Sequence, residues 1–580
     1  MNSPRRRRSW YSAHRAWLFA AVFIFGAGIR AIDLWRPVDG RIRESWRESD
    51  EAAIARNFTR EGMNILYPRI DWRGDGPGYA EMEFPLFPWT IAVLYDTFGF
   101  HEVLGRILAY TFALATLAIF LALARRLLPW RGALAAGLFF ALNPLIVRVS
   151  NALQPEALML LAYVAGVYAF VRWIDARRPG HRAAGWWMAA AFATSIAILA
   201  KATAAHVGVL FAVLLWRRYR WAAARDPWVW AFGVIALVPS ALWYSHAHHL
   251  WITYGNSLGL SNEDHWIGAD VFRESSFTLG LITAELFYVW TAAGALTGLY
   301  GLAAAPNAPA ARVAVPWLAG AMLFYVAAIR TTANSWALYY HIFSVAPVAL
   351  LFGLGVAQLA RLRWRPATRA AIAVAMIPCA IVLWYIVAHD LPIGYSSSRG
   401  VKLGAIALVV GFMTILVVRG RGRTSSLKRA PGLAITAGVA APLALLLLGA
   451  QVAADIHPHH ETGNFIAAKL FAPTIPPGAL ILSSGGPCHT VMATHVAYNQ
   501  SYMFYWLDRK GFDVCVEQQS MARLDSVVQR GARYFVANDT LVRSQPGFAD
   551  SLDRRFPILA TSNGWSLYAL RPADNGEHGH

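Results

Sequence analysis

The chain is short of charge, above all of negative charge. Charged residues make up 15% of its 580 residues, and 33 acidic residues stand against 52 lysines and arginines. Hydrophobic residues make up 57%, and the mean hydropathy is +0.40. A soluble core of this length needs far less apolar surface. The composition therefore excludes a soluble globular protein and predicts an integral membrane protein.

Motifs for nucleotides and for catalytic zinc are absent from the sequence. It contains no GxxxxGK[ST], no GxGxxG and no HExxH. A soluble machine driven by nucleotides is therefore unsupported. No small-residue cleavage site follows the basic N-terminus and its hydrophobic stretch, which predicts an uncleaved first helix and not a signal peptide.

Cysteine is scarce, with three residues in the whole chain. Cys379 lies within an apolar run, whereas Cys488 and Cys515 lie in the polar C-terminal region. If that region is exported, the latter two can form a disulfide. If it is cytoplasmic, they are two unrelated thiols. The sequence leaves both alternatives open.

Basic residues gather in short clusters between long apolar runs. The clusters occupy residues 5–8, 125–131, 172–182, 217–225, 361–369 and 419–429. This is the positive-inside pattern of membrane proteins, so the net charge of +19 indicates a cytoplasmic membrane face and not a nucleic-acid partner. We expect the N-terminus in the cytoplasm. The arginine- and alanine-rich usage favours a bacterial inner membrane.

Thirteen apolar runs are long enough to cross a bilayer. They cover residues 16–33, 101–124, 131–149, 155–174, 184–200, 203–216, 228–247, 278–304, 313–329, 339–360, 367–389, 402–418 and 432–454. With residues 5–8 inside, every basic cluster falls on the cytoplasmic side. The further apolar segment 84–98 is short and would invert the topology if it crossed. We predict an interfacial or re-entrant helix there.

The odd number of spans sends residues 455–580 to the outside. β-rich runs lie at 479–484, 534–537 and 565–570. They alternate with helical patterns (YMFYWLDRK, MARLDSVVQRGA), which predicts a small α/β domain. The predicted architecture is an all-α polytopic membrane domain over residues 1–454, with a first outer loop at 34–100, followed by an exported α/β domain.

Polar and ionisable residues at the ends of several apolar runs share the predicted outer face. They come from the first outer loop and from three later turns: Asp50, Glu51, Glu83, Arg148, Glu156, Lys201, Arg330, Tyr340 and His341. Ionisable groups near or within membrane spans are costly and usually line a site. Their common side predicts one polar cavity at the outer leaflet.

Structural interpretations of these residues also stay open. Asp50 and Glu51 fit a solvated loop followed by a helix start, with Ser49 as the cap and the acids at the positive end of the helix. Lys201 fits a side chain that snorkels to the interface, as do the two arginines. The functional alternative for these cations is a phosphate partner at the outer leaflet.

The histidine-rich run His246, His248 and His249, with His265 further on, raises the question of zinc. The spacing matches no known ligand motif, and Glu83 is the one obvious carboxylate partner from another segment. The sequence assigns no metal ligand and argues for no required cofactor. It leaves a divalent metal ion open.

Four motifs, taken in order, resemble those of a known family. They are SDEAAIARNF after the first span, MEFPLFPW, LAKAT, and YYHIFSVAPVALLFG at the start of a late span. Together they resemble the polyprenyl-phosphate-dependent glycosyltransferases of the GT-C class. The closest resemblance is to the lipid A aminoarabinose transferases and the protein O-mannosyltransferases, over residues 15–360.

The resemblance implies a bundle of many helices, a first outer loop with short interfacial helices, and a soluble tail above it. It places an acceptor-side carboxylate at Asp50, beside Glu51, and the sugar or a bound metal near Glu83. It places the lipid phosphate at Lys201. The chain departs from the lipid A enzymes at Phe84, where they carry a basic residue, so the donor sugar stays open.

The predicted reaction is an inverting transfer of a sugar from a polyprenyl-phosphate-linked donor to a lipid, glycan or protein acceptor at the outer face. Asp50 acts as the base on the acceptor hydroxyl, with Glu51 beside it, and Lys201 stabilises the departing phosphate, helped by one of the arginines. The substrate-binding set is Glu83, Lys201, Arg148, Glu156, Arg330, Tyr340 and His341.

The alternative from another functional class is a polytopic transporter or lipid flippase. Such a protein should show inverted repeats and polar residues near the membrane midplane. The sequence shows no convincing internal symmetry, and its polar residues gather at one side, which favours the transferase.

Overall fold

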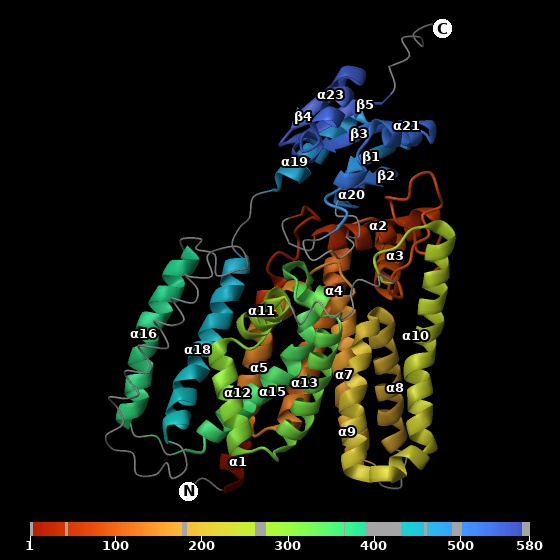
Figure 1. The fold of residues 1–580 in the computed structure, drawn as a ribbon. Helices are drawn as coiled ribbons and strands as arrows, with labels where there is room; N and C mark the ends of the chain where they lie inside the picture. The colour runs from red at the N-terminus through yellow and green to blue at the C-terminus, as the bar shows by residue number, and fades with distance from the viewer. Residues whose placement is uncertain are drawn as a thin grey trace.

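The structure is a computed structural model that describes residues 4–40, 45–176, 182–260, 274–362, 364, 366–388, 431–456, 461–489 and 501–570. Long helices form one bundle, and a small sheet lies beyond one end of it, next to the short helices α2 and α3 (Figure 1). The bundle contains α1 (Pro4–Ala31), α4 (Glu102–Leu127), α5 (Trp130–Leu142), α7 (Glu156–Ala176), α8 (Arg182–Ala200), α9 (Gly208–Tyr219), α10 (Pro227–Tyr254), α12 (Ala292–Ala304), α13 (Pro309–Ala327), α15 (Ile342–Leu359), α16 (Pro366–Ala388) and α18 (Pro431–Ile456).

Seven of the described helices are long and apolar enough to cross a membrane, or eight if one bent pair counts as a single span. They are Glu102–Leu127, Glu156–Ala176, Ala183–Ala200, Pro227–Tyr254, Pro309–Ala327, Ala337–Leu359 and Ala434–Asp455. The chain is thus a multi-pass membrane protein. The predicted number of thirteen spans is not confirmed, and the predicted span at 402–418 lies outside the described residues.

Two predicted spans are broken in the structure, each for a local reason. The run 131–149 divides into α5 and α6 (Pro144–Val149), because Pro144 begins the second helix and the Asn143 side chain accepts a hydrogen bond from the backbone N–H of Leu145. The run 278–304 divides near Thr291, which has a φ of 52° and caps α12. The helices on either side of that break are bent by 83°.

The segment predicted as interfacial or re-entrant forms helix α3 (Leu86–Phe98), which begins directly after Pro85. Its 13 residues are too few to cross the apolar part of a bilayer. The helix packs against α2 (Ser45–Glu61) through a small core that includes Ala55, Phe87 and Ile91. Its depth relative to the membrane stays a prediction.

The C-terminal region contains a five-stranded sheet in the order β2-β1-β3-β5-β4. The strands are β1 (Leu480–Ser484), β2 (Lys510–Val514), β3 (Ala532–Asn538), β4 (Ile558–Ser562) and β5 (Trp565–Ala569). β1 pairs in parallel with β2 and β3, whereas β5 is antiparallel to β3 and β4. The helices of this region are α19 (Gly463–Phe471), α20 (Ser501–Leu507), α21 (Met521–Gln529), α22 (Asp539–Arg543) and α23 (Pro546–Arg555).

Three of these strands agree with the β-rich runs, and the small C-terminal sheet is confirmed. β2 and β4 were not predicted. The helical run YMFYWLDRK ends early, because Asp508 takes a φ of 52° after α20 and the backbone is extended from Lys510. β4 is an edge strand whose side chains are mostly exposed, so its sequence lacks a clear apolar alternation.

The two faces of the sheet contact different partners. One face, with Leu482 and Phe512, packs under α21 and α23. The other face, with Ile481 and Trp565, shares a core with Ile54 and Phe58 of α2 and with α19 and α20. Because one apolar core crosses from the first outer loop to the sheet, the two are held together. The predicted domain division at residue 454 stays a prediction.

Polar contacts strengthen the same junction. Arg56 of α2 lies 2.5 Å from an oxygen of Asp71 and 2.9 Å from an oxygen of Asp508. The Tyr505 hydroxyl of α20 donates to Glu102 at 2.6 Å. Arg530, beyond α21, pairs with Asp75 at 2.5 Å. The sheet region is therefore docked on the first outer loop through side chains from several elements.

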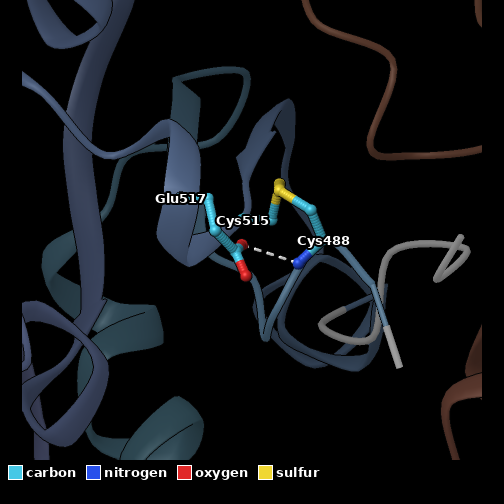
Figure 2. A group of neighbouring side chains, drawn as sticks. All are labelled: Cys488, Cys515 and Glu517. Carbon is cyan, nitrogen blue, oxygen red and sulfur yellow. Dashed lines mark hydrogen bonds between the residues drawn. A yellow bond between two sulfur atoms is a disulfide. The ribbon is translucent and has the colours of Figure 1, made fainter. Parts of the chain in front are cut away.

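Cys488 and Cys515 form a disulfide between residues 27 positions apart, which decides between the two alternatives that the sequence left open (Figure 2). The backbone N–H of Cys488 donates to Glu517 at 2.7 Å. Within the described residues these three form the one group of candidate ligands close enough to hold a metal ion. Two sulfurs joined to each other are not thiolates, so this group is a crosslink.

Candidate active site

The acidic pair lies inside helix α2. Asp50 and Glu51 are 4% and 3% exposed, and α2 begins at Ser45, so the interpretation as a solvated loop before a helix start capped by Ser49 is wrong. Adjacent helical side chains point about 100° apart. Asp50 accepts a hydrogen bond from Trp72 Nε1 at 2.9 Å, whereas Glu51 interacts with Arg47 and with two further carboxylates of the bundle side.

A buried cluster of opposite charges lies on the bundle side of α2. Arg47 donates to Glu83 at 2.7 Å, and its Nε lies 3.6 Å from Glu156. Lys201 Nζ lies 2.5 Å from Glu156 and 3.9 Å from Glu83. No side chain of these four is more than 7% exposed. With Glu51, two cations face three carboxyl groups in a space without bulk water.

Two tyrosine rings complete the cluster. Lys201 Nζ lies 4.5 Å from the ring centres of both Tyr339 and Tyr340. The Arg47 guanidinium lies 5.4 Å from the ring centre of Tyr339. Cations over aromatic faces at these distances are attracted by the ring quadrupole. The rings therefore hold the two cations in place without neutralising them.

The cluster forms because each contributor apart from Arg47 and Glu51, which are on α2, lies at or beside the end of a regular element. Glu156 is in the first turn of α7, and Glu83 stands in the extended segment before Pro85 and α3. Lys201 is extended, with φ −162°, between α8 and the short helix η1 (Ala202–Val207). The tyrosines come from the short helix η6 (Ser335–His341). Helix ends at the same height of the bundle bring their side chains together.

Burial and neighbouring charge give the carboxyl groups of the first outer loop different protonation. Burial raises the pKa of Asp50 to about 7, although the hydrogen bond from Trp72 opposes the shift. Burial also raises the pKa of Glu51 well above its usual range. For Glu83 burial acts in the same direction, but Arg47 and Lys201 outweigh it and lower the pKa. Near pH 7 Asp50 is therefore close to its midpoint, whereas the pKa shifts of Glu51 and Glu83 have opposite directions.

The structure brings six of the nine residues singled out from the sequence to this region: Asp50, Glu51, Glu83, Glu156, Lys201 and Tyr340. Arg148 instead forms a two-pronged ion pair with Asp455, at 2.7 and 2.8 Å. His341 is fully buried between Glu285, at 2.7 Å, and the carbonyl of Thr332. Arg330 lies on the short helix α14 (Ile329–Thr332). The catalytic and substrate roles of all nine residues stay predictions.

The sequence analysis missed Arg47, which is the central cation of the cluster. It stands four residues before Glu51, so the two share one face of a helix. A helix start placed at Ser45 would have signalled this pairing. Trp72 was also not predicted. Its indole N–H donates to Asp50 from a loop, and the loop sequence gives no sign of this contact.

The histidine-rich run is spread along α10 and does not converge on Glu83. The imidazole of His246 lies 2.9 Å from the carbonyl of Leu66 through Nε2. His248 lies 3.6 Å from Glu81, which also contacts Ser257. His265 lies outside the described residues. The question of a divalent ion stays as the sequence left it.

The chain is similar to several known proteins. Residues 77–244 match the family model described as dolichyl-phosphate-mannose-protein mannosyltransferase. No curated protein matches the chain. Among solved structures, ArnT from Cupriavidus metallidurans bound to undecaprenyl phosphate has 18% identity and a TM-score of 0.56, over 96% of this chain and 98% of that one. Its apo form gives 17% identity and a TM-score of 0.55, over 97% and 98%.

An oligosaccharyltransferase from Archaeoglobus fulgidus, tethered with an acceptor peptide, is also similar. It has 10% identity and a TM-score of 0.51, over 97% of this chain and 75% of that one. At these identities the solved structures show a shared fold. In its fold, and in the sequence of residues 77–244, the chain resembles the GT-C class of polyprenyl-phosphate-dependent glycosyltransferases, as its motifs predicted.

Proposed function

We propose that this protein is an inverting glycosyltransferase that moves a sugar from a polyprenyl-phosphate-linked donor to a lipid, glycan or protein acceptor. The observation that carries the proposal is the buried pair of cations, Arg47 and Lys201, of which Arg47 stands three residues before Asp50 on α2. Two comparisons support the donor class. The similar ArnT structure is bound to undecaprenyl phosphate, and the matching family model is described by dolichyl-phosphate-mannose.

Asp50 is the proposed base. It removes the proton from the acceptor hydroxyl as the acceptor oxygen forms a bond to the anomeric carbon of the sugar. The bond from that carbon to the phosphate oxygen breaks on the opposite side, and the polyprenyl phosphate leaves with the electron pair. A base is most effective when its pKa is close to the working pH, and burial brings the pKa of Asp50 to about 7.

Lys201 and Arg47 are the proposed partners of the departing phosphate. Both are now neutralised by Glu83 and Glu156, which keep the cations in a fixed arrangement within a buried space. The donor phosphate takes up contacts that these carboxylates now hold. Fixed donors in a site that excludes water stabilise developing charge strongly. Tyr340 borders the phosphate, and Glu83 borders the sugar.

Arg148, Arg330 and His341 lie outside the cluster, and the proposal gives them indirect roles. Arg148 and Arg330 contribute positive potential on the same side, and His341 supports the tyrosines that precede it in η6. The proposed steps use protein groups alone. A divalent ion near Glu83 is the alternative source of positive charge at the phosphate.

We place the site at the outer face of a bacterial inner membrane, with the N-terminus in the cytoplasm and the sheet outside. The disulfide supports this orientation, because such bonds persist in oxidising compartments. The distribution of basic clusters supports it independently.

The test is transfer by the purified protein in liposomes, from a panel of undecaprenyl-phosphate-linked sugars to acceptors in a membrane extract. Asp50→Asn is run beside Asp96→Asn, because Asp96 is an exposed acid of α3. We expect a loss of about 10²- to 10⁴-fold in the first variant and none in the second. Turnover in Asp50→Asn at the wild-type rate would remove Asp50 as the base.

The runner-up is transport of a lipid or solute. A sharp break in one apolar helix pair favours transport, because broken helices are common in transporters. The break has an angle of 83° and separates α12 from the preceding α11 (Ser275–Thr283) and η5 (Ala284–Val289). Flux of a donor lipid across the liposome membrane, with no transfer from any donor, would support transport over the transferase.

A further inference from the structure

Two polar side chains at the carboxyl ends of β1 and β2 are buried and have unused hydrogen-bonding capacity. Ser483 is fully buried and Asp513 is 8% exposed. Among the described residues, neither Ser483 Oγ nor Asp513 Oδ2 has a hydrogen-bond partner. Buried polar atoms are nearly always paired with protein, water or a ligand. The carboxyl edge of parallel strands is also where open α/β sheets bind their ligands.

The sheet places these two side chains together and directs them toward helix α2. Ser483 and Asp513 are register partners in the parallel pair β1–β2. Side chains alternate along a strand, and Ile481 belongs to the core shared with α2, so Ser483 lies on that same face. Asp513 is on the face opposite to its neighbours Phe512 and Val514, which belong to the other core.

Strand β2, which carries Asp513, contacts the loop that holds the proposed base. The backbone N–H of Gly511 donates to the carbonyl of Asp71 at 3.1 Å, and the next residue, Trp72, donates to Asp50. The charge of Asp50 raises the pKa of Asp513, after burial as the larger cause, to about 8. Ser501, the first residue of α20, donates its hydroxyl proton to the carbonyl of Trp46 at 2.9 Å, and the Trp72 indole N–H is donated to Asp50. The groups that carry the inference are therefore the Asp50 and Asp513 carboxyls and the Ser483 hydroxyl.

This set of groups selects one kind of ligand. Near pH 7 Asp50 carries part of a negative charge, which repels an anion such as a phosphate. Serine hydroxyls and a protonated carboxyl both donate and accept hydrogen bonds, as the hydroxyl groups of a sugar do. A glycine stands beside the pair at position 485, where a side chain would come within 3.0 Å of Asp513 Oδ1. A side chain at this position would crowd the carboxyl.

We infer that Ser483 and Asp513 form an acceptor subsite, in which the C-terminal sheet hydrogen-bonds a neutral, hydroxyl-bearing sugar group and presents it to Asp50. The inference rests on the proposed function, because it assumes that Asp50 acts on an acceptor hydroxyl. It adds that the sheet contributes directly to the site, and that the acceptor is a saccharide or carries one.

The test is saturation-transfer difference NMR on the purified full-length protein in lipid nanodiscs. The probes are methyl α-D-mannopyranoside and methyl β-D-glucopyranoside, with glucose 6-phosphate as the anionic comparison. We expect signal from the neutral glycosides in the wild type and a loss of at least about fivefold in Ser483→Ala and Asp513→Ala, consistent with the loss of one hydrogen bond. Asp513→Asn, which keeps a donor and an acceptor, retains most of the signal.

Ser484→Ala is the matched control. Ser484 is the neighbour of Ser483, equally buried and also unpartnered among the described residues, but its side chain is on the opposite face of β1. Its signal should equal that of the wild type, and melting temperatures of all variants are measured in parallel. Unchanged signal in both Ser483→Ala and Asp513→Ala, an equal loss in Ser484→Ala, or no signal in the wild type would overturn the subsite.

This experiment and the transfer assay fail independently. Glycoside binding that depends on Ser483 and Asp513, in a protein without transfer, keeps the subsite and removes the proposed function. If transfer depends on Asp50 but the glycoside signal is unchanged in Ser483→Ala and Asp513→Ala, the proposed function is kept and the subsite is removed.

Discussion

Helix α2 carries two sets of charges that have the same residue types and opposite environments. Toward the bundle, Arg47 pairs with Glu83 and Glu156, and every side chain is 7% exposed or less. Toward the sheet, Arg60 pairs with Asp508, and these side chains are 53% and 46% exposed. Exposed pairs contribute about 0–1 kcal/mol. Removal of one partner from a buried set costs about 3–5 kcal/mol.

The difference indicates what each set is for. The exposed pairs join the sheet to the first outer loop at little cost in desolvation. The buried set costs free energy to form, because water no longer solvates its charges, and an apolar replacement of similar shape would be as stable or more stable. Burial alone does not mark a site, because Arg56–Asp71 and Arg106–Glu48 also join α2 through buried charges. The set around Arg47 differs in that a second cation, Lys201, lies near the same two carboxylates, Glu83 and Glu156. This contrast supports the buried set, and not the exposed one, as the phosphate site.

The largest expected effect is that of Arg47→Ala. The change leaves Glu83 and Glu156 with Lys201 alone, so we expect a loss of about 3–5 kcal/mol in the free energy of unfolding. Arg60→Ala should lose no more than about 1 kcal/mol. Both are measured by denaturant titration in detergent. Equal losses in the two variants would show that the two sets do not differ. If Arg47→Ala does not fold, Arg47→Lys keeps the charge and serves for the comparison of donor binding.

The disulfide is expected to stabilise the sheet side more than any of its exposed ion pairs. A crosslink between residues 27 positions apart restricts the unfolded chain and contributes about 3 kcal/mol. The double change Cys488→Ser with Cys515→Ser should lower the melting temperature, and a reductant should do the same to the wild type. Cys379→Ala, which removes the free cysteine, is the control that should keep the reductant effect. A melting temperature insensitive to reductant would contradict the assignment.

Burial also predicts a pH dependence of transfer. The pKa of Asp50 is raised to about 7, so its basic carboxylate form is lost as the pH falls below 7. We expect the rate to fall by about tenfold per pH unit well below pH 7 and to level off above it. The residual rate of Asp50→Asn should lack this limb. Because the raised pKa disfavours the charged form in the folded state, Asp50 also reduces stability as the pH rises from about 4 to about 7.

The smallest expected effect is that of Arg148→Ala. Its guanidinium is held by Asp455, and the two side chains are 24% and 29% exposed. We expect the KM for the donor to change by less than about twofold and the free energy of unfolding by no more than about 1 kcal/mol.

Lys201→Ala serves as the comparison for Arg148→Ala. It should raise the donor KM by about tenfold or more, since one charge-assisted contact is worth about 1.5–3 kcal/mol. Similar KM values in the two variants would show that the buried set is not the phosphate site.

Part of the site could be predicted because its residues sit in strong local contexts. Lys201 is conspicuous within apolar sequence, and Glu83 stands before a proline that begins a helix. Arg47 was missed because its importance depends on where α2 begins, and helix starts are weakly encoded. Two of the thirteen predicted spans contain a break that the sequence did not reveal, at Asn143 with Pro144 and at the turn at Thr291. Hydropathy does not register a change of backbone direction.

The sequence by itself determined the membrane class, the order of the motifs and three of the five strands, because hydropathy and strand alternation are local properties of the chain. Only the tertiary structure decided which neighbours each charge has. Asp50 and Glu51 are adjacent in sequence, yet the turn of one helix sends the first toward Trp72 and the sheet and the second toward Arg47. The cluster draws on residues 47, 83, 156 and 201, whose distances depend on how helix ends meet in three dimensions.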